Sequence, residues 1–233
     1  TLADLLLSQG RHEEALAVLK DLSGRDARNL RLLRMRLDAE TALRRWDEVL
    51  ATASALAKLG GLSAQEAAAS RRAAHLGNLK RKATDAAALA AYWKQIPSEL
   101  RVDSAIAATA ASYHLSLGGA AEAQGIVESA LEAGWDARLV ALYADCAGES
   151  ALPLIERAEK WLRANARDPA LLLTLGKLCM HQGLWGKAQS YIEASLALEP
   201  THEGHMTLAA LMERLGKPQE AVRHFRRSAE LAG

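Results

Sequence analysis

The chain has 233 residues, half of them hydrophobic, and its 29 basic and 28 acidic residues give a formal net charge of +1. Aromatic residues make up only 4%, whereas the strong helix formers alanine and leucine dominate the apolar set, which disfavours an all-β protein and an α/β sheet. The charge balance lacks the positive excess of nucleic-acid-binding proteins, so we expect no nucleic-acid partner.

The two cysteines, Cys146 and Cys179, have neither metal-binding nor redox spacing. This excludes a disulfide framework and favours a reducing compartment. No apolar run reaches the 18 to 20 residues, roughly, of a membrane span.

The first predicted helical hairpin opens the chain. Its marks are small residues and leucines at helical spacing around one glycine, namely Leu2, Ala3, Gly10, Ala15 and Leu19. We expect a second hairpin over residues 26–59, interrupted at Arg44 and Arg45. Because Leu2 already corresponds to the middle of a first helix, we expect the chain to have been excised from a longer one.

The middle of the chain departs from this pattern. Ser63 and Glu66 have the spacing of a capping box, which predicts a helix that runs to about Lys82. Thr84 or Asp85 is expected to cap a further helix that ends before the next proline.

Basic residues gather in the first of these two helices, and they are Arg71, Arg72, Lys80, Arg81 and Lys82. We interpret them as a solvated helix face, with contact to an anionic membrane surface as the alternative.

Three more hairpins and a clear repeat follow. The first is marked by Ala110, Ala111, Gly118, Ala123, Val127 and Ala130. A less regular hairpin spans about 139–168, with Ala158 and Leu162 in its second helix. The clearest unit runs from Pro169 to Pro200, and its marks are Leu172, Leu175, Gly176, Gly183, Ala188, Ile192, Ser195 and Leu196. The same marks recur in the last unit as Leu208, Ala209, Gly216, Ala221, Phe225 and Ser228.

Each mark has a physical reason. Small residues let two helices approach closely, Gly183 can end a helix in the left-handed conformation, and Pro200 cannot continue one. The pattern resembles the tetratricopeptide repeat, which implies an all-α fold, an α-α superhelix of antiparallel helix hairpins. We expect a single α-solenoid over residues 1–233, irregular over 1–98 and more regular over 99–233.

Motifs that would carry catalysis are missing. The sequence has no Walker A motif, no GxSxG and no GxGxxG after a credible strand, so we predict that it is not an enzyme. His202 and His205 lie three residues apart, but they lack a third ligand, and we favour a solvated helix terminus over a metal site.

Repeats of this class usually bind partners on a concave face lined by their first helices. The repeat template predicts a partner-binding groove made of Leu173, Lys177, Met180, His181, Met206, Glu213 and Arg214. Such a groove suits an apolar or an anionic protein segment, and an ordinary solvated face is the alternative.

Four segments extend beyond the general repeat pattern, and they are RRWDEVL, AYWKQIPSELR, GWDARLVALYADC and ERAEKWLRANARDPALLLTLGKLCMHQGLWGKAQSYIEASLAL. They resemble the C-terminal repeat region of the proteobacterial HemY family. The resemblance implies an inner-membrane protein with an N-terminal transmembrane anchor and a cytoplasmic repeat region. It also implies an association with a late step of protohaem biosynthesis.

Three functions follow from this resemblance. The first is a non-catalytic scaffold whose protein partners are haem-pathway enzymes. The second is a carrier module that binds haem or porphyrin through His181, Met180 and Lys177; otherwise we expect no cofactor. The third is an oxidoreductase, because the family shares its name with a protoporphyrinogen oxidase, but the flavin motif of that enzyme is absent here.

Overall fold

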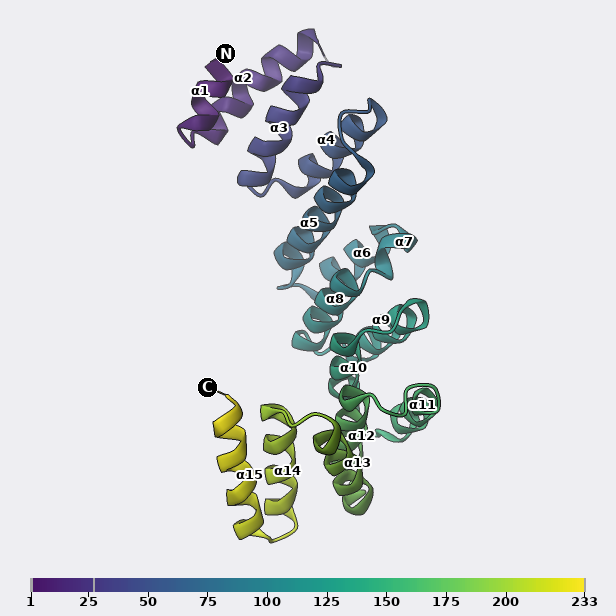
Figure 1. Cartoon of the computed structure of the whole chain (residues 1–233). Helices are drawn as coiled ribbons and strands as arrows, with labels where there is room; N and C mark the ends of the chain where they lie inside the picture. The colour runs from purple at the N-terminus through teal and green to yellow at the C-terminus, as the bar shows by residue number, and fades with distance from the viewer. Residues whose placement is uncertain (1, 27, 233) are drawn as a thin grey trace. The chain divides into compact units, whose positions relative to one another are not determined.

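The computed structural model describes residues 2–26 and 28–232. By its internal contacts the chain divides into a first unit, Thr1–Leu100, and a second unit, Arg101–Gly233. Every regular element in the described residues is a helix, which confirms the predicted all-α fold (Figure 1). Among these helices, none combines the length and the apolarity that a membrane crossing requires.

The helices of the first unit pack in sequential order. They are α1 (Leu2–Ser8), α2 (His12–Arg25), α3 (Leu30–Ala42), α4 (Trp46–Lys58), α5 (Ala64–Lys82) and α6 (Ala86–Gln95). Each of them contacts the next along the chain. The short helix α7 (Ser98–Arg101) extends to the boundary between the units.

The second unit consists of hairpins in which a first helix is followed by a second. Its elements are α8 (Ser104–Ser116), α9 (Ala120–Ala133), α10 (Ala137–Tyr143), the 3₁₀ helix η1 (Ala144–Cys146), α11 (Leu152–Leu162), α12 (Pro169–His181), α13 (Trp185–Leu198), α14 (His202–Arg214) and α15 (Pro218–Leu231). The pairs α12–α13 and α14–α15 lie side by side (Figure 1). These are the predicted hairpins of a tetratricopeptide-repeat solenoid.

Each first helix of the second unit begins at a residue whose side chain caps it. The capping residues are Asp103, Asp136, Asp168 and Thr201, and their side chains accept hydrogen bonds from backbone N–H groups of the first turn. Such caps satisfy donors that a helix leaves free at its start. The caps recur after about one repeat length each time, so they set the register of the first helices.

Left-handed residues mark the turn inside each regular hairpin. Gly183 has φ 73°, its N–H donates to the carbonyl of Met180, and the N–H of Leu184 donates to the carbonyl of Cys179. This pair of hydrogen bonds is the Schellman motif, which ends α12 and releases the chain into α13. The prediction for Gly183 is therefore confirmed. Gly10, Gly118 and Gly216 have the same positive φ.

Arg44 occupies this left-handed position without being glycine, at φ 55°. Because a side chain crowds the backbone there, we expect Arg44→Gly to raise the free energy of unfolding by about 1 kcal/mol. Urea denaturation measures the change. Gly183→Ala is the matched reverse substitution and is expected to lower the same quantity by about 1 kcal/mol. An Arg44→Gly variant that is less stable than the parent would contradict this explanation.

The irregular middle of the chain contains capping hydrogen bonds that the sequence predicted. The hydroxyl of Ser63 accepts the N–H of Glu66 at 3.2 Å, and the N–H of Ser63 donates to the carboxylate of Glu66 at 2.7 Å. This confirms the capping box at the start of α5. Asp85, rather than Thr84, caps α6 through the N–H of Ala88.

An aromatic cluster supports the less regular hairpin that begins with α10. The rings of Trp135 and Trp161 meet edge to face at 5.9 Å between centroids, and Tyr143 lies 4.7 Å from Trp161. The indole N–H of Trp135 donates to the Asp168 carboxylate at 2.6 Å. Because Asp168 also caps α12, this cluster links the start of α10 to the start of the next first helix.

Candidate functional site

The first helices of the second unit line a groove of about 620 Å³. Its wall consists of Ala108, Thr109, Ser112, Tyr113, Arg138, Ala141, Leu142, Asp145, Lys177 and Glu203. These residues come from α8, α10, η1, α12 and α14, which are the first helices of four successive hairpins together with the 3₁₀ turn. Because alanine, serine and threonine occupy much of the wall, the groove leaves room for side chains of another molecule.

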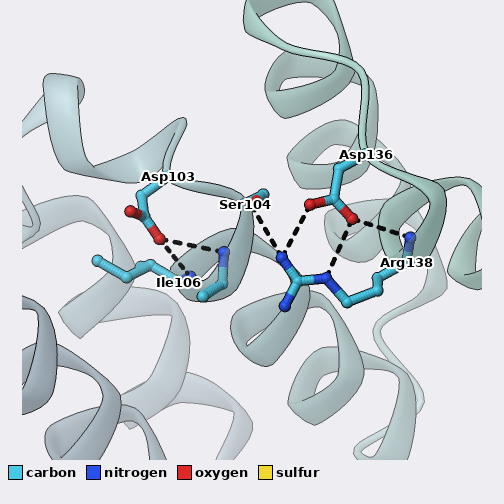
Figure 2. A network of polar contacts seen from close by, with 6 residues as sticks. Asp103, Ser104, Ile106, Asp136 and Arg138 are labelled. Carbon is cyan, nitrogen blue, oxygen red and sulfur yellow. Dashed lines mark hydrogen bonds and ion pairs between the residues drawn. The ribbon is translucent and has the colours of Figure 1, made fainter.

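One end of the groove is organised around Arg138 (Figure 2). Its guanidinium donates to both carboxylate oxygens of Asp136, at 3.1 and 2.8 Å, and to the hydroxyl of Ser104 at 3.1 Å. Asp136 caps α10, and Asp103 caps α8 beside Ser104. Arg138 therefore ties the starts of two neighbouring first helices together, and it holds the pKa of Asp136 well below its usual value.

The other charged pair of the groove joins α12 to α14. Lys177 donates to the carboxylate of Glu203 across these two helices. Both cations of the wall, Lys177 and Arg138, thus have a carboxylate partner inside the protein. The positive charge of the groove is therefore compensated before any ligand arrives.

Among the seven predicted groove residues, Lys177 lines the observed groove. Leu173 is buried, Met180 is half-buried and His181 is exposed as the last residue of α12. None of these three belongs to the described wall. The structure therefore does not gather Lys177, Met180 and His181 around one hollow.

The three predicted residues on α14 also lie outside that wall. Met206 and Glu213 are exposed, whereas Arg214 places its guanidinium 6.0 Å from the ring centre of Trp185. This cation–π contact links α14 to the preceding second helix. A partner-binding role for these residues stays a prediction.

The wall residues on α8 and α10 were not predicted from the sequence. When the repeat template is applied to the first two hairpins of the second unit as well as to the last two, it places Tyr113 and Arg138 on first helices. The signal that locates Arg138 is its position two residues after the capping Asp136. Asp145 follows in the 3₁₀ turn, which the template does not anticipate.

The histidines of the last hairpin contact one another or Ser228. Nδ1 of His205 lies 3.1 Å from Nδ1 of His224, and Nδ1 of His202 lies 2.7 Å from the hydroxyl of Ser228. Within the described residues, no three histidine, cysteine or acidic side chains are grouped to hold a metal ion. The cysteines are buried, and burial raises the pKa of Cys179 to about 11, so its thiol stays protonated at neutral pH.

A buried polar network crosses three helices of the first unit. The amide of Asn78 in α5 donates to the Tyr92 hydroxyl at 2.9 Å and to the Asp47 carboxylate at 2.8 Å. His75 contacts the same hydroxyl at 2.9 Å. Arg81 donates to Asp47 as well.

Four of the five basic residues of this segment, Arg71, Arg72, Lys80 and Arg81, are exposed, as expected for a solvated helix face, and Lys82 is half-buried. Arg81 pairs with Asp47, and the Lys82 ammonium lies 5.5 Å from the ring centre of Tyr92. Arg71 donates to the backbone carbonyl of Ala67 within α5. Contact of this segment with a membrane stays a prediction.

Protonation of buried and half-buried histidines is expected to destabilise the chain in mild acid. Burial lowers the pKa of His75, His114 and His205 in the folded state. The unfolded chain then binds more protons below its histidine pKa of about 6.5, so the free energy of unfolding falls as the pH drops from about 7 to 5. Urea denaturation at several pH values measures this. A free energy of unfolding that stays constant or rises as the pH is lowered over that range would contradict the lowered pKa values of these histidines.

These observations define the class of protein. Antiparallel hairpins, regularly spaced caps and left-handed turn residues together form a tetratricopeptide-repeat architecture. No family model matches the sequence, and no curated protein does so either.

Several solved structures are similar to the chain. A tetratricopeptide repeat protein from Parabacteroides merdae ATCC 43184 shares 16% identity, with 99% of this chain and 91% of that one covered and a TM-score of 0.49. MamA MSR-1 shares 17% identity over 68% of this chain and 92% of that chain, with a TM-score of 0.42. A thermophilic TPR protein of Thermus thermophilus shares 18% identity over 99% of this chain and 88% of that chain, with a TM-score of 0.30. At such identities, similarity concerns the fold alone.

Proposed function

We propose that this chain is a non-catalytic protein-binding scaffold and that the groove of the second unit is its binding surface. The observation that carries the proposal is the groove itself, about 620 Å³ in volume and lined by the first helices of four hairpins. Its small and polar side chains leave space and hydrogen-bonding groups for a peptide segment. Repeat folds generally use extended surfaces of this kind for binding.

We further propose that the scaffold is of the HemY type. On this proposal its partners are enzymes of a late step of protohaem biosynthesis at the inner membrane. The repeats then lie on the cytoplasmic side, and a transmembrane segment outside residues 1–233 anchors them. The proposal is supported by the sequence segments AYWKQIPSELR and GWDARLVALYADC and by the block around Trp161.

We propose that the chain carries no resident cofactor and that its ligand is protein rather than tetrapyrrole. Lys177 is engaged by Glu203, and His181 lies exposed at the end of α12, outside the groove. Titration of the purified chain with haem, and separately with protoporphyrin, tests this by the Soret band. We expect no saturable change. One-to-one binding that is lost in His181→Ala would instead establish the carrier function.

Filling the groove is the direct test of the scaffold. Ala141→Trp places an indole in the wall between α8 and α10, and we expect it to weaken partner binding by tenfold or more, because a blocked groove excludes the ligand. The amounts of haem-synthesis enzymes that co-purify with the protein from its host measure the effect.

The matched control is Ser129→Trp, which adds the same side chain at an exposed position of the second helix α9. This control is expected to retain its partners. Equal retention by both folded variants would show that partners do not bind in the groove.

A further inference from the structure

The groove of the second unit contains one carboxylate that no basic side chain compensates. Asp145 lines the wall and is exposed. Within the described part of the chain, its carboxylate makes no hydrogen bond and no ion pair, whereas Glu203, the other acid of the wall, is paired with Lys177. Because Arg138 is paired with Asp136, an unbalanced negative charge remains at Asp145.

The residues that share this wall suit a cationic side chain. Tyr113 offers a phenol ring and a hydroxyl that has no hydrogen-bond partner among the described residues. A cation is attracted both to the face of such a ring and to a carboxylate. Leu142 and Ala141 provide apolar surface that the methylene stem of lysine or arginine can cover.

An anionic ligand fits the same wall less well. The charge of Arg138 is already balanced by Asp136, which also caps α10, and the charge of Lys177 is balanced by Glu203, so an anion would gain less from either cation. The ligand would also face the free carboxylate of Asp145, and like charges at close range are unfavourable.

We propose that the groove recognises a protein segment by one of its lysine or arginine side chains, which binds between the Asp145 carboxylate and the Tyr113 ring. This inference rests on the proposed protein-binding function of the groove and names the chemistry of its partner. It differs from the apolar or anionic segment expected for the groove predicted from the sequence, which shares only Lys177 with this wall.

The test uses a display library of random 12-residue peptides as the probe. Peptides are selected on the whole chain, and only those that no longer bind Ala141→Trp are kept as groove binders. We expect lysine and arginine to be enriched among them. Asp145→Asn, which keeps the size of the side chain, is expected to weaken these peptides about fivefold, as for a solvent-accessible ion pair.

The matched control is Glu149→Gln, which removes an exposed carboxylate from the same loop region without touching the groove wall. This variant is expected to bind the peptides as the parent does. Selection on Asp145→Lys, which reverses the charge, is expected to enrich aspartate and glutamate instead.

The two possible failures are distinguishable. Groove binders that lack basic enrichment, or that bind Asp145→Asn as tightly as the parent, would overturn the basic-segment inference and leave the groove as a protein-binding site. A selection that yields no peptide sensitive to Ala141→Trp would overturn both.

Discussion

Gly176→Ala in α12 is expected to lower the free energy of unfolding by about 3 kcal/mol, because the new methyl group has no space. A Cβ atom at this position would lie 2.4 Å from Cγ1 of Ile192 in α13. Ile192 is fully buried and β-branched, so it has few alternative rotamers. The two helices of the hairpin would have to separate. Urea denaturation followed by circular dichroism measures the loss.

Gly125→Ala in α9 is the matched control for this effect. It introduces the same methyl group in the interior of another helix of the second unit, and no atom lies within 4 Å of the new Cβ. Alanine is the better helix former, so we expect this variant to be more stable by about 0.5 to 1 kcal/mol. Changes in the free energy of unfolding that have the same sign and size for both variants would contradict the close approach of α12 and α13.

Asn78→Ala in α5 is expected to cost about 3 kcal/mol of stability in the first unit. The Asn78 side chain is fully buried and connects Asp47 of α4 with Tyr92 of α6. Truncation removes both hydrogen bonds and leaves a cavity between three helices. The free energy of unfolding, measured by urea denaturation, gives the cost.

Two further variants separate the network from general effects on α5. Tyr92→Phe removes only the shared hydroxyl and is expected to cost about 1 to 2 kcal/mol. Lys80→Ala changes an exposed residue of the same helix and is expected to stay within about 0.5 kcal/mol of the parent. If Asn78→Ala is no more harmful than Lys80→Ala, the network does not stabilise the packing of α4, α5 and α6.

Local chemistry made much of the fold predictable. The turn at Gly183, the capping box at Ser63 and the end of α6 before Pro97 depend on residues within one turn of each other. Such signals are present in the sequence because the interacting groups are neighbours along the chain. The spacing of small residues also made the helical hairpins predictable, because two helices approach closely only where the side chains between them are small.

Contacts between distant segments were not predictable in the same way. The partner of Trp135 is Asp168, and the partner of His75 is Tyr92. No local pattern marks either pair, because each depends on how whole helices pack. For the same reason, the sequence placed Lys177 in the groove but did not identify Asp145. The Asp145 carboxylate is unpaired because the neighbouring basic residues pair with other acids, as Lys177 does with Glu203.

Site-specific photo-crosslinking in the native host tests the central claim most directly. A benzophenone amino acid at Ser112, in the groove wall on α8, is compared with one at Ser129, on the second helix α9 of the same hairpin. Both positions are exposed. The scaffold proposal predicts that enzymes of haem biosynthesis crosslink from Ser112 and not from Ser129. Identical crosslinked proteins from both positions, or none from Ser112, would contradict it.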